Sequence, residues 1–423
     1  MVDHEERISA TLRAVSDDLR ARPTLLAEVR TGALRRQRRR RVAGGAAIAA
    51  AAVLVASAVA AGGLRSVAGP ERPLGTHVST SPSPTASRSA EVAAPGTCRI
   101  DRLPVPEGHP RSLVTGGDPT GRFLVGRAYG STGFVARHPL LIWDDGVPTR
   151  VDMPGDDEAF DDITSTGMAV GSAFTGRDTQ SAFVYRDGKL TRLRAPAGSV
   201  QARAVAENGT IVGNLGGGSE PYQPLVWSGP DGEAQFLPLP DGFPEGETVD
   251  VDDDGTVLAK VSVAGSRGPD GGDHAHVWAP DGSGRLLPMP EVGGKPAQTF
   301  WPISIHDGVV FGRAARPIGS GGVSFDSFLF NLRTGTYTPL THAFGLVGTS
   351  EGWIVGQEWD GPFVAAPGGR APLPMLVPLS EDPVTRLMNM AVHISADGTV
   401  IGGQAVDDKS QIQAVRWRCT KVV

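Results

Sequence analysis

Short apolar, β-branched runs alternate with polar turns from about residue 111 to the C-terminus. In residues 203–213 a strand-like run, an Asn-Gly turn and a second strand-like run follow one another. Residues 248–258 and 392–402 repeat this pattern with Asp-Gly turns. Such turns need a positive φ, which Asn, Asp and Gly tolerate. The pattern therefore predicts a series of β-hairpins.

A third and a fourth strand are predicted to follow each hairpin. The third strand usually ends in an aromatic residue, as in 139–143, 181–185 and 274–278, and the copy at 362–365 is weaker. The fourth strand is short, as in 190–193. Each unit is thus expected to form a small four-stranded sheet.

The units recur with a period in the forties. The mark is a small residue in the second strand, and the intervals between marks run from 42 to 53 residues. The marks are Gly126, Gly171, Gly213, Ala259, Gly312, Gly356 and Gly402. This period with this strand content is typical of a β-propeller, with one blade per repeat. The fold class is therefore predicted to be all-β, a seven-bladed propeller.

The last unit has no fourth strand of its own. Residues 98–106 resemble the fourth strands of the other units, so an N-terminal strand is expected to complete the last blade and leave no open edge. Cys98 begins this strand, and Cys419 lies just after the last third strand. These are the two cysteines of the chain, and we expect them to form a disulfide that closes the ring.

The region before the repeats divides into three segments. Residues 1–41 carry a net charge of +5 and are predicted to be a cytosolic basic segment with two short amphipathic helices. Residues 42–64 are uncharged and long enough to span a bilayer as a helix. Residues 65–97 are rich in Ser and Pro and are predicted to be a disordered linker.

An arginine cluster sets the expected orientation of the span. It precedes residue 42 and comprises Arg35, Arg36, Arg38, Arg39, Arg40 and Arg41. Arginine is retained on the cytoplasmic side, so the N-terminus is predicted to be cytoplasmic and residues 98–423 extracytoplasmic. A cleaved signal peptide is the alternative, and the long leader argues against it. Residues 98–423 carry a net charge of −12, which gives no reason to expect nucleic-acid binding.

Three local patterns are candidates for chemical sites. Asp250, Asp252 and Asp254 alternate before a Gly, a spacing that suits calcium, although no acidic residue follows to complete the ligand shell. His274 and His276 could share one strand face as metal ligands, and a half-buried strand face explains them equally. Ser350 lies in a Gly-x-Ser-x-Gly sequence, but a strand follows where a nucleophile elbow needs a helix.

Residues 181–193, Ser-Ala-Phe-Val-Tyr-Arg-Asp-Gly-Lys-Leu-Thr-Arg-Leu, resemble the HAF-type extracellular repeats of bacterial propellers. The resemblance covers residues 98–423. It implies a surface-exposed propeller and no catalytic residues. Lys260 departs from the pattern, which has a small or polar residue after the Gly. The basic segment, single span and ectodomain together resemble small actinobacterial membrane proteins sometimes paired with alternative sigma factors.

The predicted function is binding without catalysis or a required cofactor. A rigid ring with variable loops would present a surface to an envelope protein or wall component, held at the cell membrane by the span. One alternative is a transmembrane sensor whose residues 3–34 bind a cytosolic regulator. Another is a propeller hydrolase or lyase, for which at least three acids or histidines should gather at one mouth of the channel.

Overall fold

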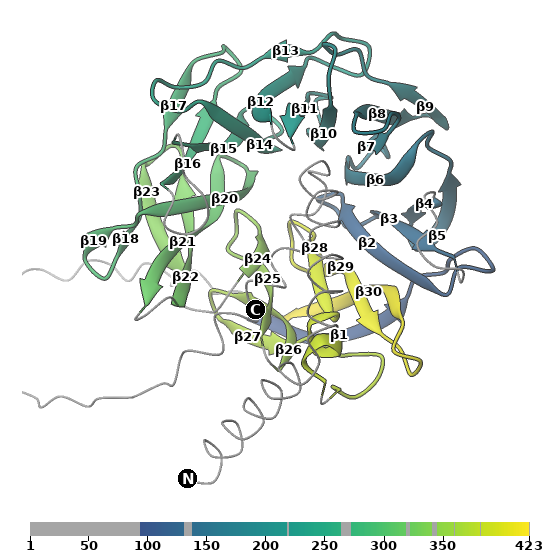
Figure 1. Ribbon diagram of the computed structural model, residues 1–423. Coiled ribbons are helices and arrows are strands. Elements are labelled where there is room, and N and C mark those ends of the chain that lie inside the picture. The colour runs from purple at the N-terminus through teal and green to yellow at the C-terminus, as the bar shows by residue number, and fades with distance from the viewer. Residues whose placement is uncertain are drawn as a thin grey trace, which may run out of the picture.

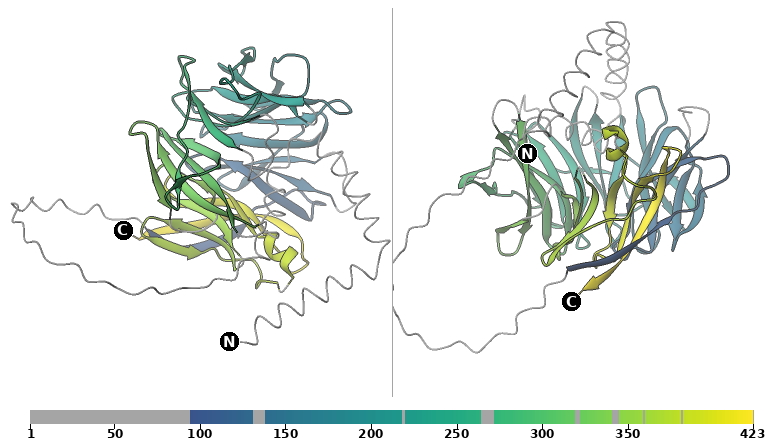
Figure 2. Two further views of the ribbon diagram at one scale, coloured as in Figure 1. Left: turned by 60° about the vertical axis from the view of Figure 1, so that its left-hand side comes forward. Right: turned by 90° about the horizontal axis from the view of Figure 1, so that it is seen from below.

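A computed structural model describes residues 94–130, 138–217, 220–263, 272–318, 322–340, 345–358, 360–380 and 382–422. These residues form a seven-bladed β-propeller, in which each blade is an antiparallel four-stranded sheet (Figure 1). The predicted fold and blade number are confirmed. The side views show the strands of each blade running between the two faces of the ring (Figure 2).

The first strand of each blade lies nearest the central axis, and the fourth lies outermost. Blades 1 and 2 contain β2 (Arg111–Gly117), β3 (Phe123–Tyr129), β4 (Leu140–Asp144), β5 (Val147–Val151), β6 (Asp156–Ile163), β7 (Ala169–Phe174), β8 (Gln180–Arg186) and β9 (Lys189–Arg192). Blades 3 and 4 contain β10 (Val200–Val205), β11 (Ile211–Gly217), β12 (Glu220–Trp227), β13 (Gln235–Phe236), β14 (Glu245–Val251), β15 (Val257–Ser262), β16 (Asp273–Trp278) and β17 (Gly284–Leu286).

The later blades follow the same order. Blades 5 and 6 contain β20 (Thr299–His306), β21 (Val309–Ile318), β22 (Gly322–Asn331), β23 (Thr336–Leu340), β24 (Gly345–Gly348), β25 (Ile354–Glu358), β26 (Gly361–Ala366) and β27 (Gly369–Pro372). Blade 7 contains β28 (Met390–Ile394), β29 (Val400–Val406), β30 (Ile412–Val422) and β1 (Ala94–Arg102). The hairpin β18 (Glu291–Val292) and β19 (Lys295–Pro296) precedes blade 5, and the short helix α4 (Pro383–Leu387) precedes blade 7.

The ring is closed by pairing the two ends of the described chain. Strand β1 pairs antiparallel with β30 and is the fourth strand of blade 7, as expected (Figure 2). Cys98 and Cys419 face each other in this register and form a disulfide with an S–S distance of 2.02 Å. The predicted disulfide is confirmed. The strand begins at Ala94, within the residues assigned above to the linker.

A β-bulge between the first and second strands explains the recurring glycine. All seven blades carry a shift in register at this position. A Cβ at Gly126, Gly171 or Gly213 would collide with a carbonyl oxygen of the neighbouring first strand. In blade 7 Gly403, and not Gly402, takes this place, so the mark read from the sequence was one residue too early.

In blades 1, 3, 4 and 7 the tryptophan of the third strand anchors the blade to the preceding connection. The indole Nε1 of Trp227 donates to the carbonyl of Arg194 at 2.7 Å, and the blade 7 equivalent, Trp417, donates to Pro374 at 2.6 Å. Trp143 and Trp278 make the equivalent bonds. Each of these rings is fully buried, so the bond satisfies a polar atom that burial would otherwise penalise.

We distinguish the two faces of the ring by the loops that they carry. The top face carries the loops between second and third strands and the connections between blades, and the bottom face carries the turns between first and second strands. Among the described residues no helix is long and apolar enough to cross a membrane. The predicted span at 42–64, its arginine cluster and the basic segment lie outside the described residues.

Candidate functional site

The bulge of the first strand holds different residues in different blades. Five blades place an uncharged residue there: Thr115, Val249, Ile303, Leu346 and Val392. Blades 2 and 3 place Asp161 and Arg203 there instead, and the two form an ion pair at 3.4 Å. A bulge turns its extra residue out of the strand ladder and is common beside functional sites. This pair is therefore the centre of the candidate site.

Further charges extend this pair on both sides into a row of alternating sign across blades 1 to 4. We define the charged row as Asp157, Arg127, Asp161, Arg203, Glu247 and Lys260. Arg127 pairs with Asp157 at 2.8 Å, and Lys260 pairs with Glu247 at 3.2 Å. Arg127 also acts on Asp161, and Glu247 acts on Arg203, through their charges. The row holds three acids and three bases, so it carries no net formal charge.

The row is half-buried. Neighbouring acids keep its bases protonated, whereas burial raises the pKa of Asp161 despite the opposing effect of Arg203 and Arg127. Burial lowers the pKa of Lys260, but the carboxylates of Glu247 and Asp273 outweigh it and the net pKa is raised. Burial likewise disfavours the charged form of Arg203, whose pKa is nevertheless raised by Asp161 and Glu247. The side chain of Arg203 is 20% exposed and that of Lys260 is 32% exposed. The row is therefore reachable from solvent while its pairs stay intact.

Two tyrosines flank the charged row. Arg127 donates from Nε to the hydroxyl of Tyr129 at 2.7 Å, and the ring of Tyr129 lies 4.6 Å from that of His138. Burial raises the pKa of both Tyr129 and Tyr222, so both phenols stay neutral near pH 7. Neutral phenols beside ion pairs offer both hydrogen bonds and apolar faces to a ligand.

Aromatic residues continue this surface into blade 5. The indole of Trp301 donates to Asp273 at 2.7 Å, and its ring lies 5.3 Å from that of Phe325. Arg313 lies over Phe325 at 5.8 Å, and burial lowers the pKa of this arginine to about 10. A guanidinium over an aromatic face is a cation–π contact.

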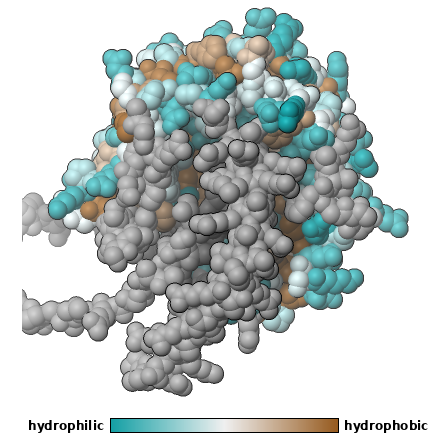
Figure 3. Space-filling view, in the orientation of Figure 1, coloured by the Kyte–Doolittle hydropathy of each residue, from teal (hydrophilic) through white to brown (hydrophobic). Residues whose placement is uncertain are grey.

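The rest of the described surface has no continuous apolar patch. Its exposed large hydrophobic residues are far apart in the sequence: Val147, Phe236, Val263, Leu286 and Met388. In the view of Figure 3 the hydrophobic areas are interrupted by hydrophilic residues. A polar ligand or partner is thus favoured over an apolar one.

The three predicted calcium ligands have other contacts. Asp250 accepts hydrogen bonds from the amides of Val251 (2.9 Å) and Ile305 (2.8 Å). Asp252 accepts from its neighbour Asp253 at 3.0 Å, and across the blade boundary from the amides of Asp307 (3.0 Å) and Gly308 (2.7 Å).

The bonds from the amides of Ile305, Asp307 and Gly308 connect blade 4 to blade 5. Asp254 differs, because within the described part of the chain its side chain accepts only from the amide of Thr256 in its own turn, at 2.7 Å. Within the described ranges no three His, Cys, Asp or Glu side chains are grouped so that they could hold a metal ion. The role of the three aspartates as calcium ligands stays a prediction.

Similar bonds link other turns on the bottom face. Glu207 accepts from the amide of Ser165 in blade 2 at 2.6 Å, and the amide of Glu207 donates to Asp253 in blade 4 at 3.1 Å. Ser350 lies in the corresponding turn of blade 6 and donates to Asp307 at 3.1 Å. A strand follows it, as the sequence suggested. The bottom face is thus tied together by its own turns.

The two strand histidines pack as aromatic residues. His276 is buried with its ring 4.3 Å from that of Trp278, and burial lowers its pKa to about 4. His274 lies 5.2 Å from the ring of Phe243. Packing against neighbouring aromatic rings therefore accounts for both histidine side chains.

The charged row was not found from the sequence. Its members come from different repeats, and Asp161 and Arg203 are 42 residues apart. Comparing the bulge position across all seven repeats could have indicated the site, because only blades 2 and 3 have a charged residue there. Lys260 had been singled out from the sequence, but Arg127 and Arg313 follow the small residue of their own repeats in the same way, so a basic residue at this position is not unusual.

Comparison with known proteins identifies the fold and no family. No protein-family description matches the chain, and no curated protein matches it. Among solved structures, the chain is similar to the β-propeller domain of the Trilobed protease from Pyrococcus furiosus, with a TM-score of 0.50 and 9% identity over 74% of this chain and 98% of that one. It is also similar to the polysaccharide lyase Uly1, with a TM-score of 0.49 and 9% identity over 77% and 99% of the two chains. TolB from Acinetobacter baumannii matches with a TM-score of 0.37 and 12% identity over 55% of each chain.

Proposed function

We propose that this protein is an extracytoplasmic binding module that recognises a partner protein through the charged row and its flanking tyrosines. The observation that carries the proposal is the alternation of charge from Asp157 to Lys260. Arginine and tyrosine are enriched at protein interfaces. Partly exposed ion pairs add little stability, so a partner with complementary charges can replace them at low cost.

We also propose that residues 42–64 anchor the propeller in the cell membrane with a cytoplasmic N-terminus. The arginine cluster before residue 42 supports this orientation. The Cys98–Cys419 disulfide supports an oxidising compartment for the propeller. The likeness of residues 181–193 to extracellular HAF-type repeats agrees with that location.

The test is site-specific photo-crosslinking of the full-length protein in its native cells. A photoreactive phenylalanine analogue replaces Tyr222 beside the row, or, as the matched control, Phe236 on the outer strand β13. A discrete crosslinked partner is expected from position 222 and not from position 236. Equal crosslinking at both positions, or none at position 222, contradicts a partner site on the row.

Neutralising the central pair separates recognition from folding. Asp161→Asn combined with Arg203→Gln removes both charges together, while Arg127 keeps Asp157 and Lys260 keeps Glu247, so the thermal stability should stay close to that of the wild type. The crosslink at position 222 should fall at least about tenfold, because the partner loses the two central charges that it complements. Undiminished crosslinking in a folded variant would show that the row is structural only.

An enzyme is the second candidate, and one observation favours it. The row and its neighbours gather acids from blades 2 and 4, and His138 lies against Tyr129 with its backbone amide bound to Glu158 at 3.0 Å. Acid and base groups at one place could serve a hydrolase or lyase. Turnover of an envelope polysaccharide or peptide that is lost in His138→Ala would establish this candidate in place of pure binding.

The sensor hypothesis concerns the opposite end of the chain. Residues 3–34 would bind a cytosolic regulator, which the paired amphipathic segments support. Crosslinking in cells should then recover a cytosolic protein with the full-length chain and lose it when residues 3–34 are deleted. Recovery of the same partners from both forms would assign these residues to anchoring alone.

A further inference from the structure

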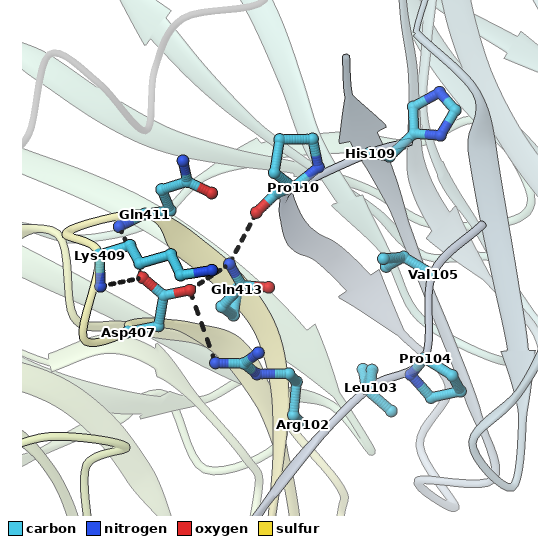
Figure 4. A pocket seen from close by; sticks show the side chains of 10 residues that line it. All are labelled: Arg102, Leu103, Pro104, Val105, His109, Pro110, Asp407, Lys409, Gln411 and Gln413. Carbon is cyan, nitrogen blue, oxygen red and sulfur yellow. Dashed lines mark hydrogen bonds and ion pairs between the residues drawn. The ribbon is translucent and has the colours of Figure 1, made fainter. Parts of the chain in front are cut away.

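A cleft lies on the top face where the chain passes from the closing strand β1 into blade 1. Its volume is about 350 Å³. One wall is the connection at residues 102–105 and 109–110, and the other is the turn between β29 and β30 at residues 407–413 (Figure 4). The two walls come from opposite ends of the described chain, so the cleft exists only when the ring is closed. It shares no residue with the charged row.

The single carboxylate in the cleft is already occupied. Asp407 is 7% exposed and accepts hydrogen bonds from the amides of Lys409 (3.0 Å) and Gln411 (2.9 Å) on one oxygen. Its other oxygen accepts from the side-chain amide of Gln413 at 2.9 Å and pairs with Arg102 at 3.6 Å (Figure 4). This carboxylate has no acceptor capacity left for an entering cation.

The cationic groups of the cleft, in contrast, have donors to spare. Arg102 is half exposed, and its one ion pair here, to Asp407, is longer than a hydrogen bond. Figure 4 shows the Lys409 side chain extending beside Asp407 toward Gln413. Lys409 is exposed, and no partner of its ammonium group is recorded among the described residues. With the carboxylate of Asp407 balanced by one cation, the cleft keeps a residual positive charge within a region whose net charge is −12.

The walls of the cleft are fixed in place. Gln413 also donates to the carbonyl of Pro110 at 2.7 Å, so one side chain joins both walls. The amide of Leu103 donates to the carbonyl of Ala414 at 2.9 Å, and the indole of Trp143 donates to that of Pro104 at 2.7 Å. A site whose walls are already ordered loses little conformational freedom when a ligand binds.

We propose that this seam cleft binds an oxyanion, a carboxylate or a sulfate, carried by a compact ligand the size of a sugar acid. Arg102 and Lys409 would bind the anionic group, since charge-assisted hydrogen bonds to oxyanions are the strong ones available here. The body of the ligand would lie against Leu103, Pro104 and Val105. The volume is near the lower end of the range for small-molecule sites, roughly 300–1,000 Å³.

The test measures binding of glucuronate, glucose and inorganic sulfate to the full-length protein at constant ionic strength. Glucuronate and glucose differ in the carboxylate, so glucuronate should bind and raise the melting temperature while glucose does neither. Sulfate competing with glucuronate would show that the charge suffices, and failure of sulfate to compete would show that the sugar ring is needed. Equal effects of glucuronate and glucose overturn the proposal.

The variant Arg102→Gln with Lys409→Gln assigns the site. It should weaken glucuronate binding by at least about tenfold, because the loss of a single hydrogen bond to a charged group already lowers an affinity by about that factor. Lys189→Gln with Arg192→Gln is the matched control, since it removes the same charge from the exposed strand β9. Equal weakening in both variants would assign the effect to overall charge and refute the seam site.

Discussion

Asp252 offers the sharpest test of how neighbouring blades are held together. Its carboxylate accepts from the amides of Asp307 and Gly308 in blade 5, at 3.0 and 2.7 Å, and from Asp253 in its own turn. The substitution Asp252→Ala removes the acceptor for all three donors. Asp254→Ala is the matched control, because it removes the same charge two residues away but only the bond to Thr256 within the same turn.

The expected loss follows from the two bonds that cross the blade boundary. A hydrogen bond to a charged group contributes about 1.5–3 kcal/mol, and water can replace part of it at this turn. We expect Asp252→Ala to lower the free energy of unfolding by about 3 kcal/mol and Asp254→Ala by less than about 1 kcal/mol. With an unfolding entropy of roughly 0.7 kcal/mol per degree for a domain of this size, the first loss lowers the melting temperature by about 4 °C.

Scanning calorimetry with and without a chelator distinguishes this account from the calcium hypothesis. If the aspartates act as acceptors for backbone amides, the chelator leaves the wild-type melting temperature unchanged and Asp252→Ala falls equally in both buffers. If they bind calcium, the chelator lowers the wild-type value by as much as the substitution does, and Asp254→Ala falls as far as Asp252→Ala. The second pattern would falsify the structural account.

Three further changes test the closure, the buried histidines and the aromatic anchors. Replacing Cys98 and Cys419 by Ser should lower the free energy of unfolding, measured by urea denaturation, by about 2–5 kcal/mol, because the disulfide joins residues 321 positions apart. An unchanged free energy of unfolding would mean that the pairing of β1 with β30 alone closes the ring. Burial lowers the pKa of His393 to about 4, below its unfolded value of 6.5, so the stability that neutral His393 allows is complete above pH 6.5 and is lost as the pH falls toward 4. In urea unfolding, His393→Gln should therefore remove about 2 kcal/mol of the difference in stability between pH 7 and pH 5. Identical pH profiles of the variant and the wild type would contradict this. Trp227→Phe should destabilise by about 1–2 kcal/mol in the same assay, because it deletes the bond to Arg194, and a loss below about 0.5 kcal/mol would make that bond unimportant.

The fold could be predicted because each blade encodes itself locally. The Asn-Gly and Asp-Gly turns, the alternation within strands and the aromatic end of the third strand all lie within one repeat. Closure was also readable, since the last repeat lacked a strand and Cys98 and Cys419 marked the two edges that had to meet. The glycine mark was misread by one residue in blade 7 because Gly402 and Gly403 are adjacent and only the bulge decides between them.

The candidate site could not be predicted in the same way because it depends on contacts between blades. Asp161 and Arg203 meet only when blades 2 and 3 pack side by side, and nothing within either repeat indicates the other. The alternating aspartates had the opposite problem. Their spacing suits calcium, but the same spacing places Asp250 and Asp252 against the backbone of blade 5, which the sequence does not show.

The bottom turns and the charged row differ in what their charged groups contact, and this difference decides where a partner can bind. On the bottom face the carboxylates of Asp250 and Asp252 accept from backbone amides of the next blade, so a ligand that withdrew them would leave those donors unsatisfied and weaken the ring. In the charged row Arg203 and Lys260 contact other side chains, which can rotate and exchange partners while the backbone ladders stay intact. Binding at the row therefore costs little of the folding free energy, whereas binding at the bottom turns would oppose it. This asymmetry is why neutralising Asp161 and Arg203 together should weaken recognition and preserve the fold.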